Sequence, residues 1–149
     1  MESEEIARAL AEVAGTVIRS LTDRRGMSFT TASTLGRLER EGPVRLTALA
    51  AAEGVAQPSM TQLVQRLESH GLATRVGDPD DGRVSLVAVT DAGREVLAER
   101  RREREARLVR LLAALTEDER EALGAAMGTA VPLVRRMVQE PDRPGDVQR

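Results

Sequence analysis

The sequence predicts a mainly α-helical fold with a small β-hairpin, an α+β arrangement with helices before and after the hairpin. Three observations predict it. Over most of the 149 residues, apolar side chains recur every three or four positions, as on one face of a helix. Between residues 72 and 90 the period falls to two, which is typical of strands. Glycine and proline stand at the boundaries between these segments.

The N-terminal part predicts two helices and a short strand. Residues 3–21 form an amphipathic pattern with acidic residues in the first turn, where they complement the helix dipole. Residues 30–42 predict a shorter helix ended by Gly42, because glycine readily adopts the left-handed conformation that follows many helices. Pro43 prevents continuation, and the run VRL at 44–46 is a candidate edge strand.

Two helices joined by a tight turn follow. Residues 47–53 predict a compact helix with Thr47 as its N-cap. Gly54 turns the chain, and Pro58 stands near the start of the next helix, where proline is well tolerated. That helix runs to Gly71, and its apolar stripe consists of Met60, Leu63, Val64 and Leu67. A helix, a glycine-containing turn and a second helix make a helix-turn-helix.

A hairpin follows the helix pair. The β-prone runs LATRV at 72–76 and RVSLVAVT at 83–90 flank the turn sequence GDPDDG at 77–82, so they pair most naturally with each other. A hairpin appended to a helix-turn-helix is a winged helix. We therefore predict a winged helix-turn-helix over about residues 30–98.

The rest of the chain predicts two more helices. Thr90 caps a long helix over 91–115, and TEDE at 116–119 is a capping box that opens the last helix. The segments at about 3–22 and 108–138 are more apolar than a small winged helix needs, and a two-fold related copy is their simplest cover. We expect a homodimer joined through these helices, and a flexible C-terminal tail over 141–149.

Composition excludes several classes of protein. The absence of cysteine rules out disulfides, thiol switches and cysteine zinc sites, and the single histidine, His70, argues against a metal sensor. No glycine-rich phosphate loop and no nucleophile–base arrangement appear, so we expect neither enzymatic activity nor a cofactor. No apolar run is long enough to span a membrane and no secretory leader opens the chain, so we expect a soluble, cytoplasmic protein.

The second helix of the pair carries the first candidate interaction surface. The net charge is only −2, so the distribution of charge has to indicate the partner. Opposite the apolar stripe lies a polar face that carries one arginine and no acid: Pro58, Thr61, Gln62, Gln65, Arg66 and Ser69. Hydroxyl and amide groups bind base edges and phosphate oxygens, so this face predicts DNA recognition. The alternative is an ordinary solvated surface.

Arg83 is the second candidate. Turn geometry explains Pro79 and Gly82 but does not explain an arginine directly after so acidic a turn. A narrow minor groove concentrates negative potential and attracts an inserted arginine. Asp81 lies on the same side of the extended segment, and an Asp81–Arg83 pair would fix the direction of the guanidinium before DNA arrives. The alternative is a hairpin tip that is merely solvated.

The stretch ERRREREAR at 99–107 mixes arginine with glutamate. We interpret it as the exposed middle of a long helix rather than as a basic patch.

The residues between 46 and 98 resemble the MarR family of winged-helix transcription regulators. The resemblance rests on GL-x-x-R leading into the first wing strand, on D-x-R at 81–83, and on LVAVTDAG running into the long helix. It implies a single MarR-like domain over 1–140 that forms an obligate homodimer and binds a pseudo-palindromic operator, more often as a repressor. The DNA-binding candidates are then Gln57, Pro58, Ser59, Thr61, Gln62, Gln65, Arg66, Arg75, Asp81 and Arg83.

Many members of the family release DNA when a small acid binds, often an aromatic or phenolic one. The candidate lining for such an effector is Ile18, Met27, Phe29, Val96 and Leu97. With no Trp or Tyr in the chain, an aromatic-lined pocket is hard to build, so the ligand is unusual or absent. The competing interpretation of the whole chain is a winged-helix module that binds a protein and has no operator.

Overall fold

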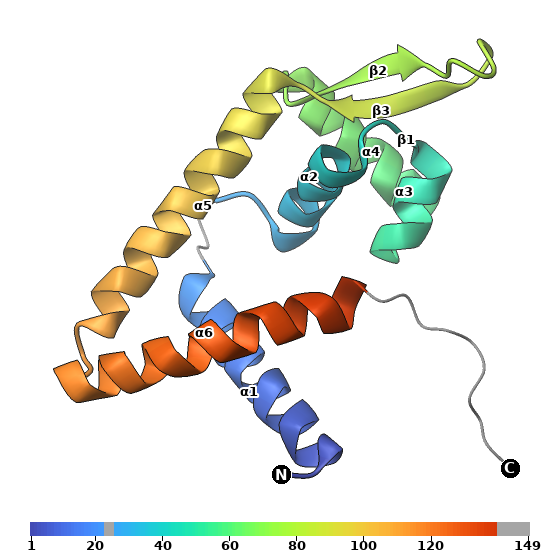
Figure 1. Ribbon diagram of the computed structural model, residues 1–149. Coiled ribbons are helices and arrows are strands. Elements are labelled where there is room, and N and C mark those ends of the chain that lie inside the picture. Colours follow the sequence, from blue (N-terminus) through green and yellow to red (C-terminus); the bar gives the residue numbers. More distant parts are fainter. Residues whose placement is uncertain (23–25, 140–149) are drawn as a thin grey trace, which may run out of the picture. The chain divides into compact units, whose positions relative to one another are not determined.

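The computed structural model describes residues 1–22 and 26–139 (Figure 1). In chain order the elements are α1 (Ser3–Leu21), α2 (Phe29–Glu41), β1 (Val44–Arg45), α3 (Leu46–Glu53), α4 (Gln57–Ser69), β2 (Ala73–Gly77), β3 (Ser85–Val89), α5 (Asp91–Leu112) and α6 (Glu117–Gln139). The mainly helical winged-helix fold is thereby confirmed. The chain divides into two compact units, Met1–Arg107 and Leu108–Arg149. The tail expected over 141–149 lies outside the described residues.

Most helix ends lie where the sequence signals place them. Gly42 ends α2 with a φ of 77°. The backbone N–H of Gly93 donates to the hydroxyl of Thr90 at 3.1 Å, which confirms Thr90 as the cap of α5. The capping box before α6 is also formed, because Glu119 N–H donates to the Thr116 hydroxyl and Thr116 N–H donates to the Glu119 carboxylate.

Two boundaries differ from the sequence prediction. Thr47 is not an N-cap: α3 begins at Leu46, and Arg45 occupies the capping position. The reason is that the chain passes directly from strand β1 into the helix, so the extended residue before α3 is the last strand residue. At the other boundary, α5 ends at Leu112 rather than at residue 115. Residues 113–115 instead form tighter turns, with N–H groups donating to carbonyls three residues back.

The sheet has three antiparallel strands in the order β1-β3-β2. The hairpin register pairs Ala73 with Val89 and Gly77 with Ser85, so the predicted wing is confirmed. Val44 pairs with Val87 on the other side of β3. The candidate edge strand therefore exists, although its third residue, Leu46, already belongs to α3.

The hydrophobic core is formed by α2, α3 and α4 against the sheet and the start of α5. Its buried members are Leu35, Leu38, Leu49, Ala50, Met60, Leu63, Val64, Leu67, Ala73, Val87, Val89 and Leu97. The core contains no aromatic side chain, because the single aromatic residue of the chain, Phe29, is exposed.

The junction between α4, β2 and α5 is closely packed. Thr90 donates from its N–H to the carbonyl of Leu72 at 3.1 Å and from its hydroxyl to the carbonyl of Gly71 at 2.6 Å. A Cβ on Gly93 would lie 2.3 Å from the Leu72 carbonyl oxygen, so only glycine fits there. The backbone that ends α4 thus also holds the first turn of α5.

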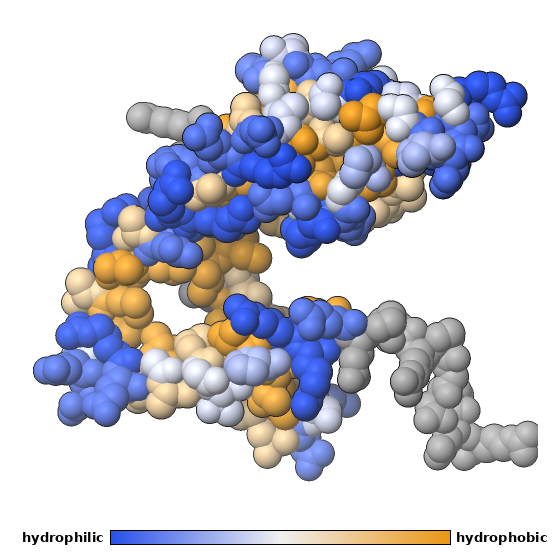
Figure 2. Space-filling model, turned by 45° about the horizontal axis from the view of Figure 1, so that its top comes forward, coloured by the Kyte–Doolittle hydropathy of each residue, from blue (hydrophilic) through white to orange (hydrophobic). Residues whose placement is uncertain are grey.

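Helices α1 and α6 contribute no buried residue, and each carries large apolar side chains at its surface. In α1 these are Ile6, Val13, Val17 and Ile18, and in α6 they are Leu123, Met127, Val131, Leu133, Met137 and Val138. Figure 2 shows apolar side chains (orange) open at the surface in the lower part of the view, where α6 lies in Figure 1. Such surface is unusual for a lone chain in water.

An ion-pair network joins α2 to α3. The Glu53 carboxylate, only 8% exposed, accepts from Arg37 Nε at 2.7 Å and from the Ser33 hydroxyl at 2.8 Å. Burial raises the pKa of this carboxyl. The hydrogen bonds from Arg37 and Ser33 and the positive charge of Arg37 outweigh burial, so the pKa lies below its ordinary value of 4.5. The ionised form therefore stabilises the fold.

We predict that Glu53→Gln lowers the free energy of unfolding at neutral pH by about 1–2 kcal/mol, through loss of the charged hydrogen bonds. Because the pKa of Glu53 in the folded protein is lowered, this contribution is present above the ordinary pKa and is lost as the pH falls through the folded-state pKa. Denaturant unfolding of both proteins over a pH series measures it.

The matched control is Glu41→Gln, which removes the exposed partner of the same arginine. It should lower the free energy of unfolding by no more than about 0.5 kcal/mol. Equal losses for the two variants, or a Glu53→Gln loss that persists in acid, would contradict this account.

Candidate nucleic-acid interface

Helix α4 has one buried side and one exposed side. Met60 and Val64 are fully buried, and Leu63 and Leu67 nearly so, all on the side facing the core. Proline at the second position of the helix leaves no backbone hydrogen bond unmade, because the first N–H groups of a helix have no internal partner. The remaining positions of α4 therefore lie at the protein surface.

The exposed side carries the polar residues that the sequence singled out. Pro58, Ser59, Gln62, Gln65 and Arg66 are all exposed, as is Gln57 at the first turn. Within the described residues, the side chains of Ser59, Gln62, Gln65 and Arg66 make no hydrogen bond to other protein groups. The hydroxyl of Thr61 differs, because it already donates to the Gln57 carbonyl at 2.9 Å, and the residue is only partly exposed. The donors and acceptors of the other four are free for a partner.

Arg83 lies in the turn that joins β2 to β3, at the end of the wing (Figure 1). Its side chain is 92% exposed. The Asp81 carboxylate accepts from both the backbone N–H of Arg83, at 3.1 Å, and its guanidinium Nε, at 3.3 Å. The Asp81–Arg83 pair is thereby confirmed. Among the described residues only Nε has a partner, so both terminal nitrogens of the guanidinium remain available.

Arg75 and Arg83 line the same open hollow on the wing, together with residues of the two strands and of the turn between them. Arg75 lies on β2, and its Nε donates to the Glu68 carboxylate of α4 at 3.1 Å. Glu68 thereby connects the end of α4 to the wing. Two cations facing one hollow can accommodate a phosphate group.

The wing turn is less negative than its sequence indicates. Two of its three aspartates are paired with arginines, Asp78 with Arg45 at 3.3 Å and Asp81 with Arg83. Three aspartates in this turn would favour a protein partner over a polyanion such as DNA. With most of its charge neutralised, that argument loses its support.

Comparison with known proteins points to one family. The model of the MarR family matches residues 17–84. An HTH-type transcriptional regulator from Mycobacterium bovis is 37% identical over 108 residues, covering 72% of this chain and 76% of the relative. The chain belongs to the MarR family.

Solved structures agree. The transcriptional regulator Tm0710 from Thermotoga maritima superposes with a TM-score of 0.77 at 26% identity, covering 93% of this chain and 99% of that one. A transcriptional regulator from Pseudomonas aeruginosa PA01 gives a TM-score of 0.69 at 31% identity, again with 93% and 99% coverage. This MarR-family chain is thus a helix-turn-helix transcriptional regulator whose class binds DNA.

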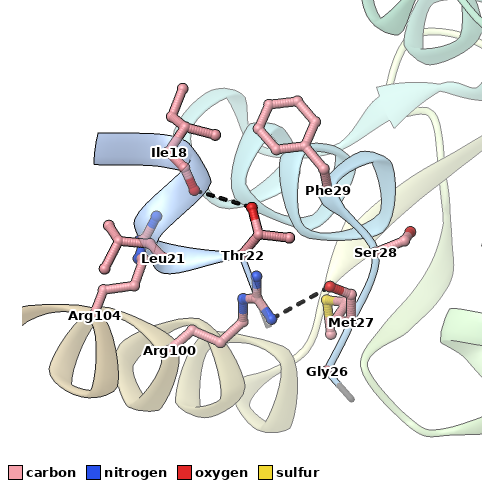
Figure 3. A pocket seen from close by; sticks show the side chains of 9 residues that line it. All are labelled: Ile18, Leu21, Thr22, Gly26, Met27, Ser28, Phe29, Arg100 and Arg104. Carbon is pink, nitrogen blue, oxygen red and sulfur yellow. Dashed lines mark hydrogen bonds between the residues drawn. The ribbon is translucent and has the colours of Figure 1, made fainter. Parts of the chain in front are cut away.

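A second hollow of this MarR-family protein, of about 390 Å³, lies where the end of α1 and the start of α2 meet α5 (Figure 3). Its lining comprises Ile18, Leu21, Thr22, Gly26, Met27, Ser28, Phe29, Arg100 and Arg104. Three of the five effector candidates, Ile18, Met27 and Phe29, therefore share one hollow. Val96 lines a different, shallow depression, and Leu97 is buried in the core.

The two arginines of this hollow were not among the sequence candidates. The stretch 99–107 was interpreted as the exposed middle of a long helix, and this is confirmed, since eight of its nine residues are exposed and Arg100 is half-buried. Several of its arginines nevertheless contact other elements. Arg100 donates to the Met27 carbonyl at 3.5 Å, Arg101 pairs with Glu39 of α2 at 2.9 Å, and Arg107 donates to the Ser20 carbonyl of α1 at 2.7 Å. The signal was present, since residues 100, 104 and 107 share one face of a helix.

The described residues contain no group of three or more metal-ligating side chains. In the same part of the chain, no helix is both long and apolar enough to cross a bilayer.

Proposed function

We propose that this protein is a homodimeric repressor that binds a pseudo-palindromic operator, with α4 in the major groove and Arg83 of the wing in the adjacent minor groove. The observation that carries the proposal is the pairing of an acid-free polar face on α4 with a 92% exposed arginine held at the end of the wing by Asp81.

The chemistry of the proposed contacts supports DNA as the partner. Gln62 and Gln65 carry free amides, which can bind adenine through two hydrogen bonds, and Arg66 can do the same with guanine. Ser59, near the helix N-terminus, is suited to a phosphate oxygen. Arg75 and Arg83 would bind the backbone and the narrow minor groove.

The apolar surface of α1 and α6 supports a second copy of the chain as the partner of these helices. Neither helix buries a residue by itself, and both present large apolar side chains. A two-fold dimer would place two α4 helices about 34–36 Å apart, one turn of DNA, and so would require an operator with matching half-sites.

The hollow of Figure 3 supports control by a small ligand. It combines apolar side chains, including the chain's single aromatic residue, Phe29, with the cations Arg100 and Arg104. This lining suits a small organic anion with an apolar body. In the proposed cycle, binding of such a ligand releases the operator.

For DNA binding, we predict salt-sensitive binding of labelled duplex from the upstream intergenic region, and a loss of about tenfold in affinity for Arg83→Ala. Gel-shift titration over a salt series measures both. The control is Arg102→Ala, which removes an equally charged, exposed arginine that is paired with Glu99 on α5. If a random duplex binds as well as every candidate operator, including those selected from a random pool, the proposed function is wrong.

For the dimer, we predict that Met127→Glu shifts the protein toward monomer, because it places a charge within an apolar face. Sedimentation equilibrium at micromolar concentration measures the change. Thr129→Glu adds the same charge two residues further on, on the other side of α6, and should leave the dimer intact. A monomeric parent protein would contradict the proposal.

For the ligand, we predict that a small aromatic carboxylate such as benzoate binds and weakens the protein–operator complex, and that Arg104→Ala lowers its affinity about tenfold. Isothermal calorimetry is suitable, since the chain lacks Trp and Tyr. Arg102→Ala is again the control. Unchanged carboxylate binding by Arg104→Ala would exclude this hollow as the site.

A further inference from the structure

Asp78 occupies a structurally central position in the wing turn. It directly follows β2, and its side chain is only 11% exposed although the surrounding turn projects into solvent. Its N–H donates to the Val84 carbonyl at 3.0 Å, and one carboxylate oxygen accepts the N–H of Asp80 at 2.9 Å. These bonds close the turn between the two wing strands.

The second carboxylate oxygen of Asp78 binds a residue from outside the hairpin. It accepts from Arg45 Nη2 at 3.3 Å. Arg45 pairs with Leu86 in the sheet and is also the N-cap residue of α3, the first helix of the helix-turn-helix. Since β1 and β2 lie on opposite sides of β3, this ion pair reaches across the central strand from one side to the other.

This contact matters because the outer part of the wing, beyond the Arg75–Glu68 ion pair that joins β2 to α4, is otherwise weakly held. Beyond the two-residue strand β1, the wing is a two-stranded ribbon, and such ribbons twist and bend easily in isolation. A tie between the turn and the start of α3 restricts that motion. It therefore reduces the freedom that the wing would lose on binding.

We propose that the Asp78–Arg45 ion pair positions the wing relative to α3 and α4, so that Arg83 and the polar face of α4 reach DNA together. Asp78 is then a positioning residue that strengthens operator binding although it carries negative charge. The inference rests on the proposed DNA-binding function.

Simple electrostatics predicts the opposite effect for this residue. Removing a carboxylate from a surface that faces a polyanion should strengthen binding to any duplex. Asp80 provides the comparison, because it lies two residues away, is exposed, and its carboxylate makes no ion pair within the described residues. Asp78→Asn and Asp80→Asn remove the same charge from the same turn, but only the first breaks the tie to Arg45. Asparagine at position 78 can still accept the Asp80 N–H, so the turn itself is kept.

The test compares the two variants on the operator and on a random duplex of equal length. Asp78→Asn should lower operator affinity about tenfold while leaving random-duplex affinity equal to or above that of the parent protein, so its specificity ratio falls. Asp80→Asn should raise both affinities together. In the Asp78→Asn background, Arg83→Ala should lower operator affinity by a smaller factor than it does in the parent protein, because the wing is no longer held in place.

Arg45→Gln tests the other half of the pair and does not depend on the role of Asp78 in the turn. It should lower operator affinity as Asp78→Asn does. The Asp78→Asn/Arg45→Gln double variant should lose no more operator affinity than the more affected single variant. Additive losses would mean that the two residues act separately, which overturns the inference. So would an Asp78→Asn protein that gains operator affinity as Asp80→Asn does.

A measurement without DNA distinguishes failure of the inference from failure of the proposed function. Amide hydrogen exchange should be faster in peptides covering 44–46 and 78–84 of Asp78→Asn, and unchanged in Asp80→Asn. If the parent protein prefers its operator but exchange and specificity are the same in both variants, only the inference is wrong. If the parent protein prefers no DNA sequence, the proposed function is wrong, and the positioning role of Asp78 is then wrong as well.

Discussion

Burial of one side of α4 is the constraint on which the proposed interface depends. Met60 and Val64 are fully buried against α2, α3 and the sheet, and burial of each such side chain contributes about 1.5–3 kcal/mol. The helix cannot rotate about its axis without exposing them. Its polar row is therefore fixed outward, and the wing, which begins four residues after α4 ends, is fixed beside it. The direction of the polar residues thus follows from the packing of the apolar ones.

The end of α4 and the beginning of α5 share the same backbone contacts. Thr90 binds the carbonyls of Gly71 and Leu72, and Gly93 lies against Leu72 too closely for any side chain. Arg100, which lines the hollow of Figure 3, lies two turns further along α5. A ligand that displaces α5 would therefore act directly on the residues that end α4. Helix α5 therefore directly connects the proposed ligand site to the end of α4.

Local signals in the sequence predicted most of the fold. The apolar stripe of α4, the caps at Thr90 and Thr116, and the turn at 77–82 each specify one element through neighbouring residues, and all of them are confirmed. Contacts between distant residues could not be predicted in this way. Arg45 and Asp78 are 33 positions apart, and Arg101 and Glu39 are 62 apart, so no periodicity relates them. The Thr47 boundary failed for a similar reason, because pairing of β1 with β3 decides where α3 begins.

Chemical footprinting with dimethyl sulfate tests the central claim most directly, because the reagent methylates guanine N7 in the major groove and adenine N3 in the minor groove. With α4 in one groove and Arg83 in the next, bound protein should protect guanines within each half-site and adenines flanking it. Arg83→Ala should restore methylation of the flanking adenines alone, and Gln62→Ala should affect only the half-site. Protection confined to one groove, or a loss of both patterns together in Arg83→Ala at saturating protein, would contradict the account.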